Sequence, residues 1–164
     1  MNNLIVVYDS HDKAIGAITK LKQAGYTSKN LSIIGRADKA RDTAKLSDKE
    51  IINVAGAEVG AGVTLGSVLG VLAGVGVFAI PGLGFLYGAG ALVGAIAGFD
   101  IGLVAGGVAS ALTVAGIKVA ETKKYDDYIE DGNMLVIAQG SADEVEKAEA
   151  LLKTGPEPVD IEKH

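Results

Sequence analysis

Hydrophobic and polar positions divide the chain into two mixed ends around a long apolar middle. Near the start, residues 4–8 are continuously apolar and predict a strand. Ser10 can cap the helix that follows, and Gly25 stands where the C-terminal cap of that helix belongs. The apolar positions of the helix recur at helical spacing: Ala14, Ile15, Ala17, Ile18, Leu21 and Ala24. Residues 31–34 then predict a second strand.

The far end repeats this order. Residues 134–138 are again continuously apolar and predict a third strand. Ser141 and Glu144 have the spacing of a capping box. The helix that they begin has its apolar face at Val145, Ala148, Leu151 and Leu152, and Gly155 ends it. Residues 159–162 alternate between apolar and acidic, as an edge strand with one wet face should.

The element order is therefore β-α-β, insertion, β-α-β, which predicts an α+β, ferredoxin-like sandwich. Residues 1–36 form its first half and residues 121–164 its second half. In this arrangement the first and third strands are central and the other two are edges. Because the central strands are continuously apolar, we expect both faces of the sheet to be covered. Two helices cover one face, and the other face meets a second subunit or the base of the insertion.

The insertion begins with residues 37–50, a charged linker or helix, and continues with a Gly/Ala-rich block over 51–120. From Val59 to Phe99, Tyr87 is the one ionisable residue. Glycines recur every four residues in two ladders: Gly62, Gly66, Gly70, Gly74, and Gly90, Gly94, Gly98, Gly102, Gly106. Glycine costs a helix in water about 1 kcal/mol relative to Ala, so this spacing favours close packing of helix backbones. We expect an antiparallel helical hairpin that turns at residues 80–84 and oligomerises through its glycines.

The length of the apolar block allows two environments. A membrane-spanning helix needs about 20 apolar residues, and residues 59–79 provide them. The second arm, up to residue 117, is longer than a bilayer requires and suits a hairpin buried in a soluble oligomer. Lysines flank both feet, as the positive-inside rule favours, although nearby acids weaken that signal.

Four polar residues interrupt the block and are predicted to be buried: Glu58, Thr64, Ser67 and Asp100. A carboxylate in an apolar helix is normally paired, interfacial or functional. Counted from the turn, Asp100 lies opposite Thr64 and Ser67, and a hydrogen bond to one of them is the simplest interpretation. A role in handling protons or ions is the alternative. Glu58 is interpreted as a charge at the foot of the helix.

Composition argues against several classes of function. The net charge is −5 and no basic stripe is interleaved with aromatic residues, so we expect no nucleic-acid partner. There is no cysteine, and His11 and His164 stand far apart, so we predict no enzyme, no metal site and no cofactor. Gly82 and Gly84 lack the Lys-Ser/Thr pair of a phosphate-binding loop. The short apolar run at the start is no signal peptide, so we expect cytoplasmic termini.

Several of these features together resemble a known group of proteins. They are Val6-Val7-Tyr8-Asp9, Gly25-Tyr26 after the first helix, the Gly/Ala block, and Tyr125-x-x-Tyr128 followed by Gly132 and residues 134–138. The chain is similar to the bacterial general stress protein 17M-like (YflT-like) and low-temperature-induced proteins that carry a glycine-zipper segment. The resemblance implies a stress-associated, membrane-linked protein and brings no catalytic residues with it.

Three functional hypotheses follow from these features. In the first, the hairpin inserts into the inner membrane and self-associates, and the α/β domain stays in the cytoplasm as an interaction module. In the second, the chain is a soluble cytoplasmic homo-oligomer or cage that buries its hairpins in a shared apolar core, where lipid or another hydrophobic molecule is a candidate ligand. The third is a small-ligand sensor built on the sheet.

Overall fold

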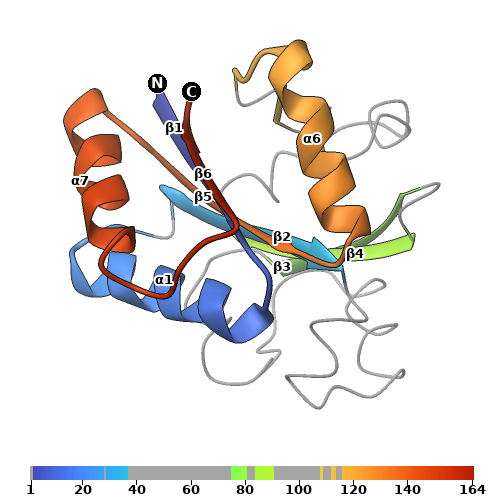
Figure 1. Ribbon diagram of the computed structural model, residues 1–164, viewed down its shortest axis with the longest axis horizontal. Coiled ribbons are helices and arrows are strands. Elements are labelled where there is room, and N and C mark those ends of the chain that lie inside the picture. Colours follow the sequence, from blue (N-terminus) through green and yellow to red (C-terminus); the bar gives the residue numbers. More distant parts are fainter. Residues whose placement is uncertain are drawn as a thin grey trace.

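A computed structural model describes residues 2–27, 29–36, 75–80, 84–90, 108, 112–113 and 116–164. Its strands are β1 (Asn2–Tyr8), β2 (Leu31–Arg36), β3 (Val75–Ile80), β4 (Gly84–Gly90), β5 (Met134–Gly140) and β6 (Asp160–Lys163). Its main helices are α1 (His11–Gln23), α6 (Val119–Glu130) and α7 (Ala142–Leu152). The chain is therefore an α+β protein, as its pattern predicts (Figure 1).

One antiparallel sheet joins strands from both ends of the chain, in the order β3-β4-β2-β5-β1-β6. β1 runs beside β5 over its whole length, from Asn2↔Gly140 to Tyr8↔Met134. On its other side β1 pairs with β6 from Leu4↔Lys163 to Val7↔Asp160. The prediction that the first and third strands are central is confirmed, and so is the edge position of the strand at 160–163.

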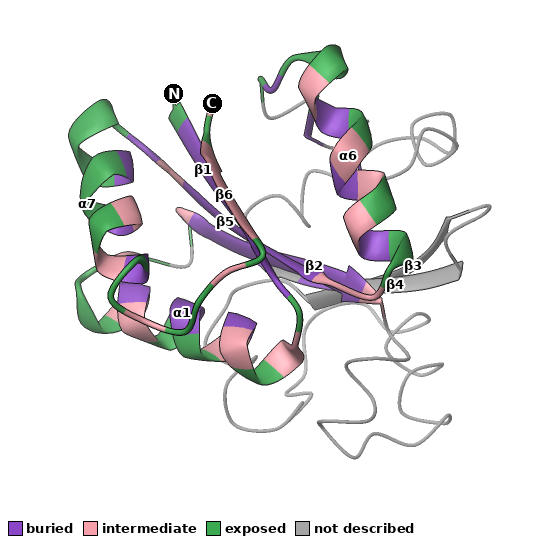
Figure 2. Ribbon diagram, viewed as in Figure 1, coloured by how far each residue is buried: buried purple, intermediate pink, exposed green. Residues whose placement is uncertain are grey.

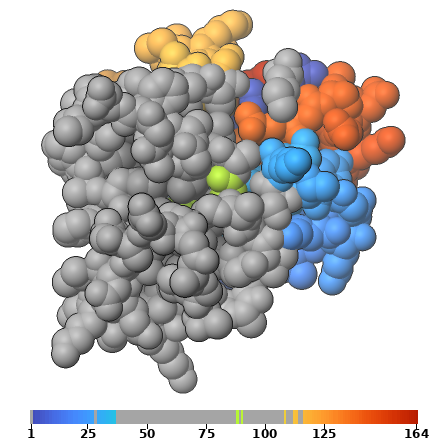
Figure 3. All heavy atoms as spheres, turned by 180° about the vertical axis from the view of Figure 1, so that it is seen from behind, coloured from blue at the N-terminus to red at the C-terminus, as the bar shows by residue number. Residues whose placement is uncertain are grey.

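Alternation along the strands sends their side chains to opposite faces of the sheet, where two separate cores form. On one face, Leu4, Val6 and Tyr8 of β1 pack with α1 and α7. On the other face, Ile5 and Val7 pack with α6 and with apolar residues just before it. Figure 2 shows the resulting buried strands, and Figure 3 shows α1 and α7 side by side from behind. Both faces are covered, as predicted, and α6 with the apolar residues just before it covers the second one.

The ends of the helices follow the local signals in the sequence. The Ser10 side chain accepts a hydrogen bond from the Lys13 backbone N–H and begins α1. Gly25 follows α1 with a φ of 97°. Ser141 and Glu144 form the complete capping box of α7, with Ser141 N–H donating to Glu144 Oε2 at 2.8 Å. These predictions are confirmed.

The predicted helical hairpin is wrong on both sides of its turn, although residues 108, 112 and 113 of its second arm are helical. Residues 75–80 and 84–90 are strands that pair with each other, from Val75↔Ala89 to Ile80↔Gly84. The reason is visible in the sequence VGVFAI, where β-branched and aromatic residues favour a strand, and every glycine would weaken a helix. Chain reversal between Ile80 and Gly84 does occur at the predicted place. The linker at 37–50 and residues 51–74, 81–83, 91–107, 109–111 and 114–115 of the insertion lie outside the described residues.

The same strands correct the prediction for β2. It was expected at an edge, but it pairs with β5 on one side and with β4 on the other. The register with β4 runs from Ser32↔Gly90 to Arg36↔Leu86. Part of the insertion thus continues the sheet instead of standing apart from it.

Candidate functional site

Of the glycines predicted to mediate oligomerisation, only Gly90 is among the residues that the structure describes. Gly62, Gly66, Gly70, Gly74, Gly94, Gly98, Gly102 and Gly106 lie outside the described residues, as do Glu58, Thr64, Ser67 and Asp100. Gly90 is described, at the end of β4. Its prediction as a helix-packing residue is therefore wrong, because it belongs to a strand.

Gly90 nevertheless lets two backbones approach closely. Its φ is 107°, a conformation that residues with a side chain rarely adopt. A Cβ built on Gly90 would lie 2.0 Å from the carbonyl oxygen of Leu31 and 2.7 Å from Cα of Ser32. The contact partner is the backbone of β2, so here glycine serves strand pairing.

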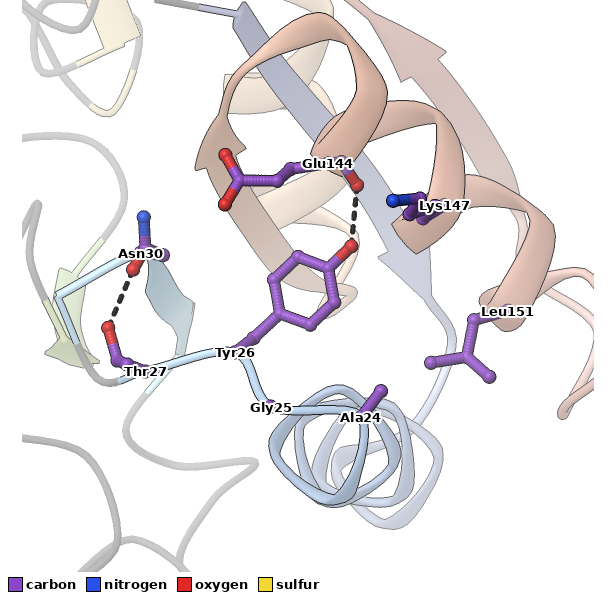
Figure 4. A pocket seen from close by; sticks show the side chains of 8 residues that line it. All are labelled: Ala24, Gly25, Tyr26, Thr27, Asn30, Glu144, Lys147 and Leu151. Atoms are coloured by element: carbon purple, nitrogen blue, oxygen red, sulfur yellow. Dashed lines mark hydrogen bonds between the residues drawn. The ribbon is translucent and has the colours of Figure 1, made fainter.

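A surface hollow of about 480 Å³ lies between the C-terminal end of α1, the segment that follows it and α7 (Figure 4). It is lined by Ala24, Gly25, Tyr26, Thr27, Asn30, Glu144, Lys147 and Leu151. The Tyr26 ring stands at its centre, and the Tyr26 hydroxyl donates to the backbone carbonyl of Glu144. This bond ties the loop after α1 to the first turn of α7.

Most polar groups of the hollow are already bonded within the protein. The Thr27 hydroxyl donates to Asn30 Oδ1 at 2.6 Å, and Asn30 Nδ2 donates to the Gln139 carbonyl at 3.1 Å. Glu144 uses its carboxylate in the capping box, which is the main reason that its pKa is lowered. The hollow thus has a mixed aromatic and polar lining without converging catalytic groups, and it fits a structural contact between helices better than a reaction site.

A second group of polar residues joins α6 to the C-terminal strand. His164 lies at the centre, with its side chain 6% exposed. Its Nε2 is 2.7 Å from the Tyr125 hydroxyl, and its Nδ1 is 2.9 Å from Glu121 Oε2. In the tautomer protonated on Nδ1, His164 donates to the Glu121 carboxylate and accepts from the Tyr125 hydroxyl.

This Glu121–His164–Tyr125 chain resembles a proton relay in its connectivity, but its reactive end is enclosed. Tyr125 is fully buried, and burial followed by the charge of Glu162 raises the pKa of its hydroxyl. A phenol with a raised pKa and no exposure makes neither a nucleophile nor a base that a substrate can reach. The hydrogen bond with His164 lowers the pKa of Glu121, which strengthens the attachment of α6 to the end of the chain.

Lys124 extends this attachment along β6. Its Nζ lies 3.1 Å from Asp160 Oδ2 and also pairs with Glu162. Burial lowers the pKa of Lys124, but hydrogen bonds to the two carboxylates outweigh it and the net pKa is raised. Sequence reasoning missed the whole group, since its members lie on α6, on β6 and at the residue that follows β6, and no local spacing connects them.

The described residues contain neither a candidate metal site nor a candidate membrane-spanning helix. Within them, no group of three or more His, Cys, Asp or Glu side chains is arranged to hold a metal ion. Nor does any helix among them have the length and apolarity to cross a lipid bilayer. Comparisons with protein-family models, curated proteins and solved structures found no match to this chain. The resemblance to the general stress protein group therefore stays a prediction.

Proposed function

We propose that this chain is a non-enzymatic protein that self-associates through its apolar insertion, with the α+β domain as the frame that holds the insertion. The observation that carries the proposal is the way the insertion joins the sheet. β3 and β4 come from the charge-free block, and β4 pairs with β2 beside the central strands. An apolar, glycine-rich segment fixed to a rigid sheet presents its backbone to other copies in a defined orientation.

The domain itself supports a ferredoxin-like arrangement. Its two β-α-β halves supply the strand order β6-β1-β5-β2, in which the fourth strand lies beside the first and the third beside the second. Helices α1 and α7 pack together on one face of these strands. The β3–β4 pair is then an addition beyond β2 that the simple pattern lacks.

Self-association is favoured over a two-helix membrane hairpin because strands interrupt the apolar block. As a helix, residues 59–74 would span about 24 Å at 1.5 Å per residue. The hydrocarbon core of a bilayer is about 30 Å thick. With residues 75–80 in a strand, the first arm is too short to carry the turn across a membrane.

Insertion of other parts of the block in a membrane is the second candidate function. It is favoured by the run from Val59 to Phe99, in which Tyr87 is the one ionisable residue. Under either candidate, the resemblance to general stress proteins suggests a role in the response to stress, and lipid or another hydrophobic molecule is a candidate partner.

Fractionation distinguishes the two candidates. Cells are lysed without detergent and their membranes are washed at high pH. Under the proposal the protein stays in the supernatant and forms a particle of several subunits by light scattering. Protein that remains in the washed pellet would instead support insertion, and a soluble monomer would contradict both.

A set of glycine variants tests the role of the insertion. Replacing Gly66, Gly70, Gly94 and Gly98 by Leu should reduce the size of the particle. The matched control is Gly16→Leu, because Gly16 lies on the exposed side of α1 and no atom lies near the position of its Cβ. Equal particle sizes in the wild type and the quadruple variant would contradict the proposed role of these glycines.

A further inference from the structure

The two edges of the sheet differ in the features that normally prevent strands from pairing between molecules. β6 at one edge carries Asp160, Glu162 and Lys163 within four residues. β3 at the other edge has the sequence VGVFAI, without a charge or a proline. Charged side chains and prolines are the usual protection of an edge strand, so one edge is protected and the other is not.

In the part of the chain that the structure describes, no strand lies on the outer side of β3. Among the described residues, β4 is its one neighbour in the sheet, from Val75↔Ala89 to Ile80↔Gly84. The backbone N–H and C=O groups of an extended strand alternate in direction, so half of those in β3 point away from β4. Such groups need partners when they are removed from water.

We infer that β3 pairs with β3 of a second copy of this chain, in antiparallel orientation about a two-fold axis. The inference rests on the proposed self-association and specifies one surface that carries it. An antiparallel pair of identical strands is isologous, so a single contact satisfies the outer backbone groups of both copies. No like charges oppose each other across it, because residues 75–80 carry none.

Because the opposite edge of the sheet is protected, assembly through β3 would stop at two copies. If both edges were open, copies would add without limit and form fibres. With the charged β6 edge blocked, each copy offers one open edge, and pairing through β3 ends at two copies with one sheet running through both. Larger particles would then need further contacts from the rest of the insertion.

Single cysteines introduced along β3 test this arrangement, because the chain contains no cysteine of its own. Each residue from 75 to 80 is replaced in turn in the full chain, the protein is oxidised mildly, and covalent dimers are measured by non-reducing electrophoresis. In an antiparallel pair, equivalent positions face each other only at the two-fold axis. Each step away from it separates them by about 7 Å, twice the rise per residue.

A disulfide requires Cβ atoms roughly 3.5–4.5 Å apart, so the cross-linking yield should peak at one position, or at two neighbours, and fall on both sides. Glu162→Cys on β6 and Gly16→Cys on α1 are the matched controls and should give little dimer. Circular dichroism of each variant confirms that it is folded, and light scattering of the unoxidised variants gives the assembly size.

The outcomes separate this inference from the proposed function. A peaked yield along β3 supports it. Two results would overturn the β3 contact and leave self-association standing. One is a particle of several subunits without any β3 cross-link. The other is such a particle with equal cross-linking yields at positions on the same face of β3, which a parallel pair would give. A monomer by light scattering overturns both.

Discussion

Replacing Gly90 by Ala tests whether this part of the apolar block is a strand or a helix, because the two structures predict opposite signs. In an exposed helix interior, Gly→Ala stabilises by about 1 kcal/mol. In the strand that the structure describes, the new Cβ would lie 2.0 Å from the Leu31 carbonyl oxygen, closer than real Cβ atoms come to any atom. Because the obstacle is backbone of β2, the strands must separate or shift.

Two terms give the expected loss of stability. Forcing a residue with a side chain to keep a positive φ costs about 1–2 kcal/mol. Inserting a methyl group into a closely packed contact costs about 1–3 kcal/mol more. Gly90→Ala should therefore lower the free energy of unfolding by roughly 2–5 kcal/mol. Gly25→Ala is the matched control, since Gly25 has a φ of 97° but no atom within 4 Å of its Cβ position, and it should show the first term alone.

Urea denaturation followed by circular dichroism measures both variants against the wild type. The difference between Gly90→Ala and Gly25→Ala isolates the contact between β4 and β2. A Gly90→Ala protein as stable as Gly25→Ala would contradict the pairing of β4 with β2. One more stable than the wild type would indicate a helix at residue 90 and refute the strand assignment.

Four further changes test the two cores, the ion pairs of Glu149 and the cap of α7. Tyr8→Phe should stabilise the protein by about 1 kcal/mol in urea denaturation, because the buried Tyr8 hydroxyl has no hydrogen-bond partner among the described atoms. Tyr125→Phe should destabilise it by about 1 kcal/mol, since this hydroxyl bonds His164; equal effects of the two changes would contradict the described bonding. Hydrogen bonds from two lysines lower the pKa of Glu149, so its contribution to stability is present above the ordinary carboxyl pKa and is lost as the pH falls through the lowered value. Denaturation between pH 6 and pH 3 should show a shallower acid loss for Glu149→Gln, and an unchanged slope would count against the ion pairs. Ser141→Ala should cost about 1 kcal/mol through loss of the α7 cap, and a loss below 0.3 kcal/mol would argue against that cap.

Local signals were enough to predict the helices and strands at the two ends of the chain except α6, which has no side-chain N-cap. Ser10 and the capping box at Ser141 fix helix starts within a few residues, and these interactions do not depend on the rest of the fold. Continuous apolarity over residues 4–8 and 134–138 correctly identified the central strands, because a strand buried on both faces needs apolar residues at every position.

The insertion shows where such reasoning fails. Glycine at every fourth position is equally compatible with close helix packing and with strands whose backbones approach each other, and composition does not distinguish them. At residues 75–80 the β-branched and aromatic residues were the better signal. The group around His164 could not be predicted from the sequence for a different reason. Glu121 and Tyr125 contact His164 only because α6 packs on the sheet.

The pairing of β1 with β5 also sets the order in which this protein can be completed during synthesis. The partner that Asn2 requires is Gly140, so the first strand emerges long before its neighbour exists. At about 5–20 residues per second, the ribosome needs roughly 7–28 seconds to reach it. The entire charge-free segment is made within that interval, ahead of the strand that closes the sheet's centre. Until β5 is made, the continuously apolar strand β1 lacks the neighbour that pairs with it along its whole length in the finished sheet.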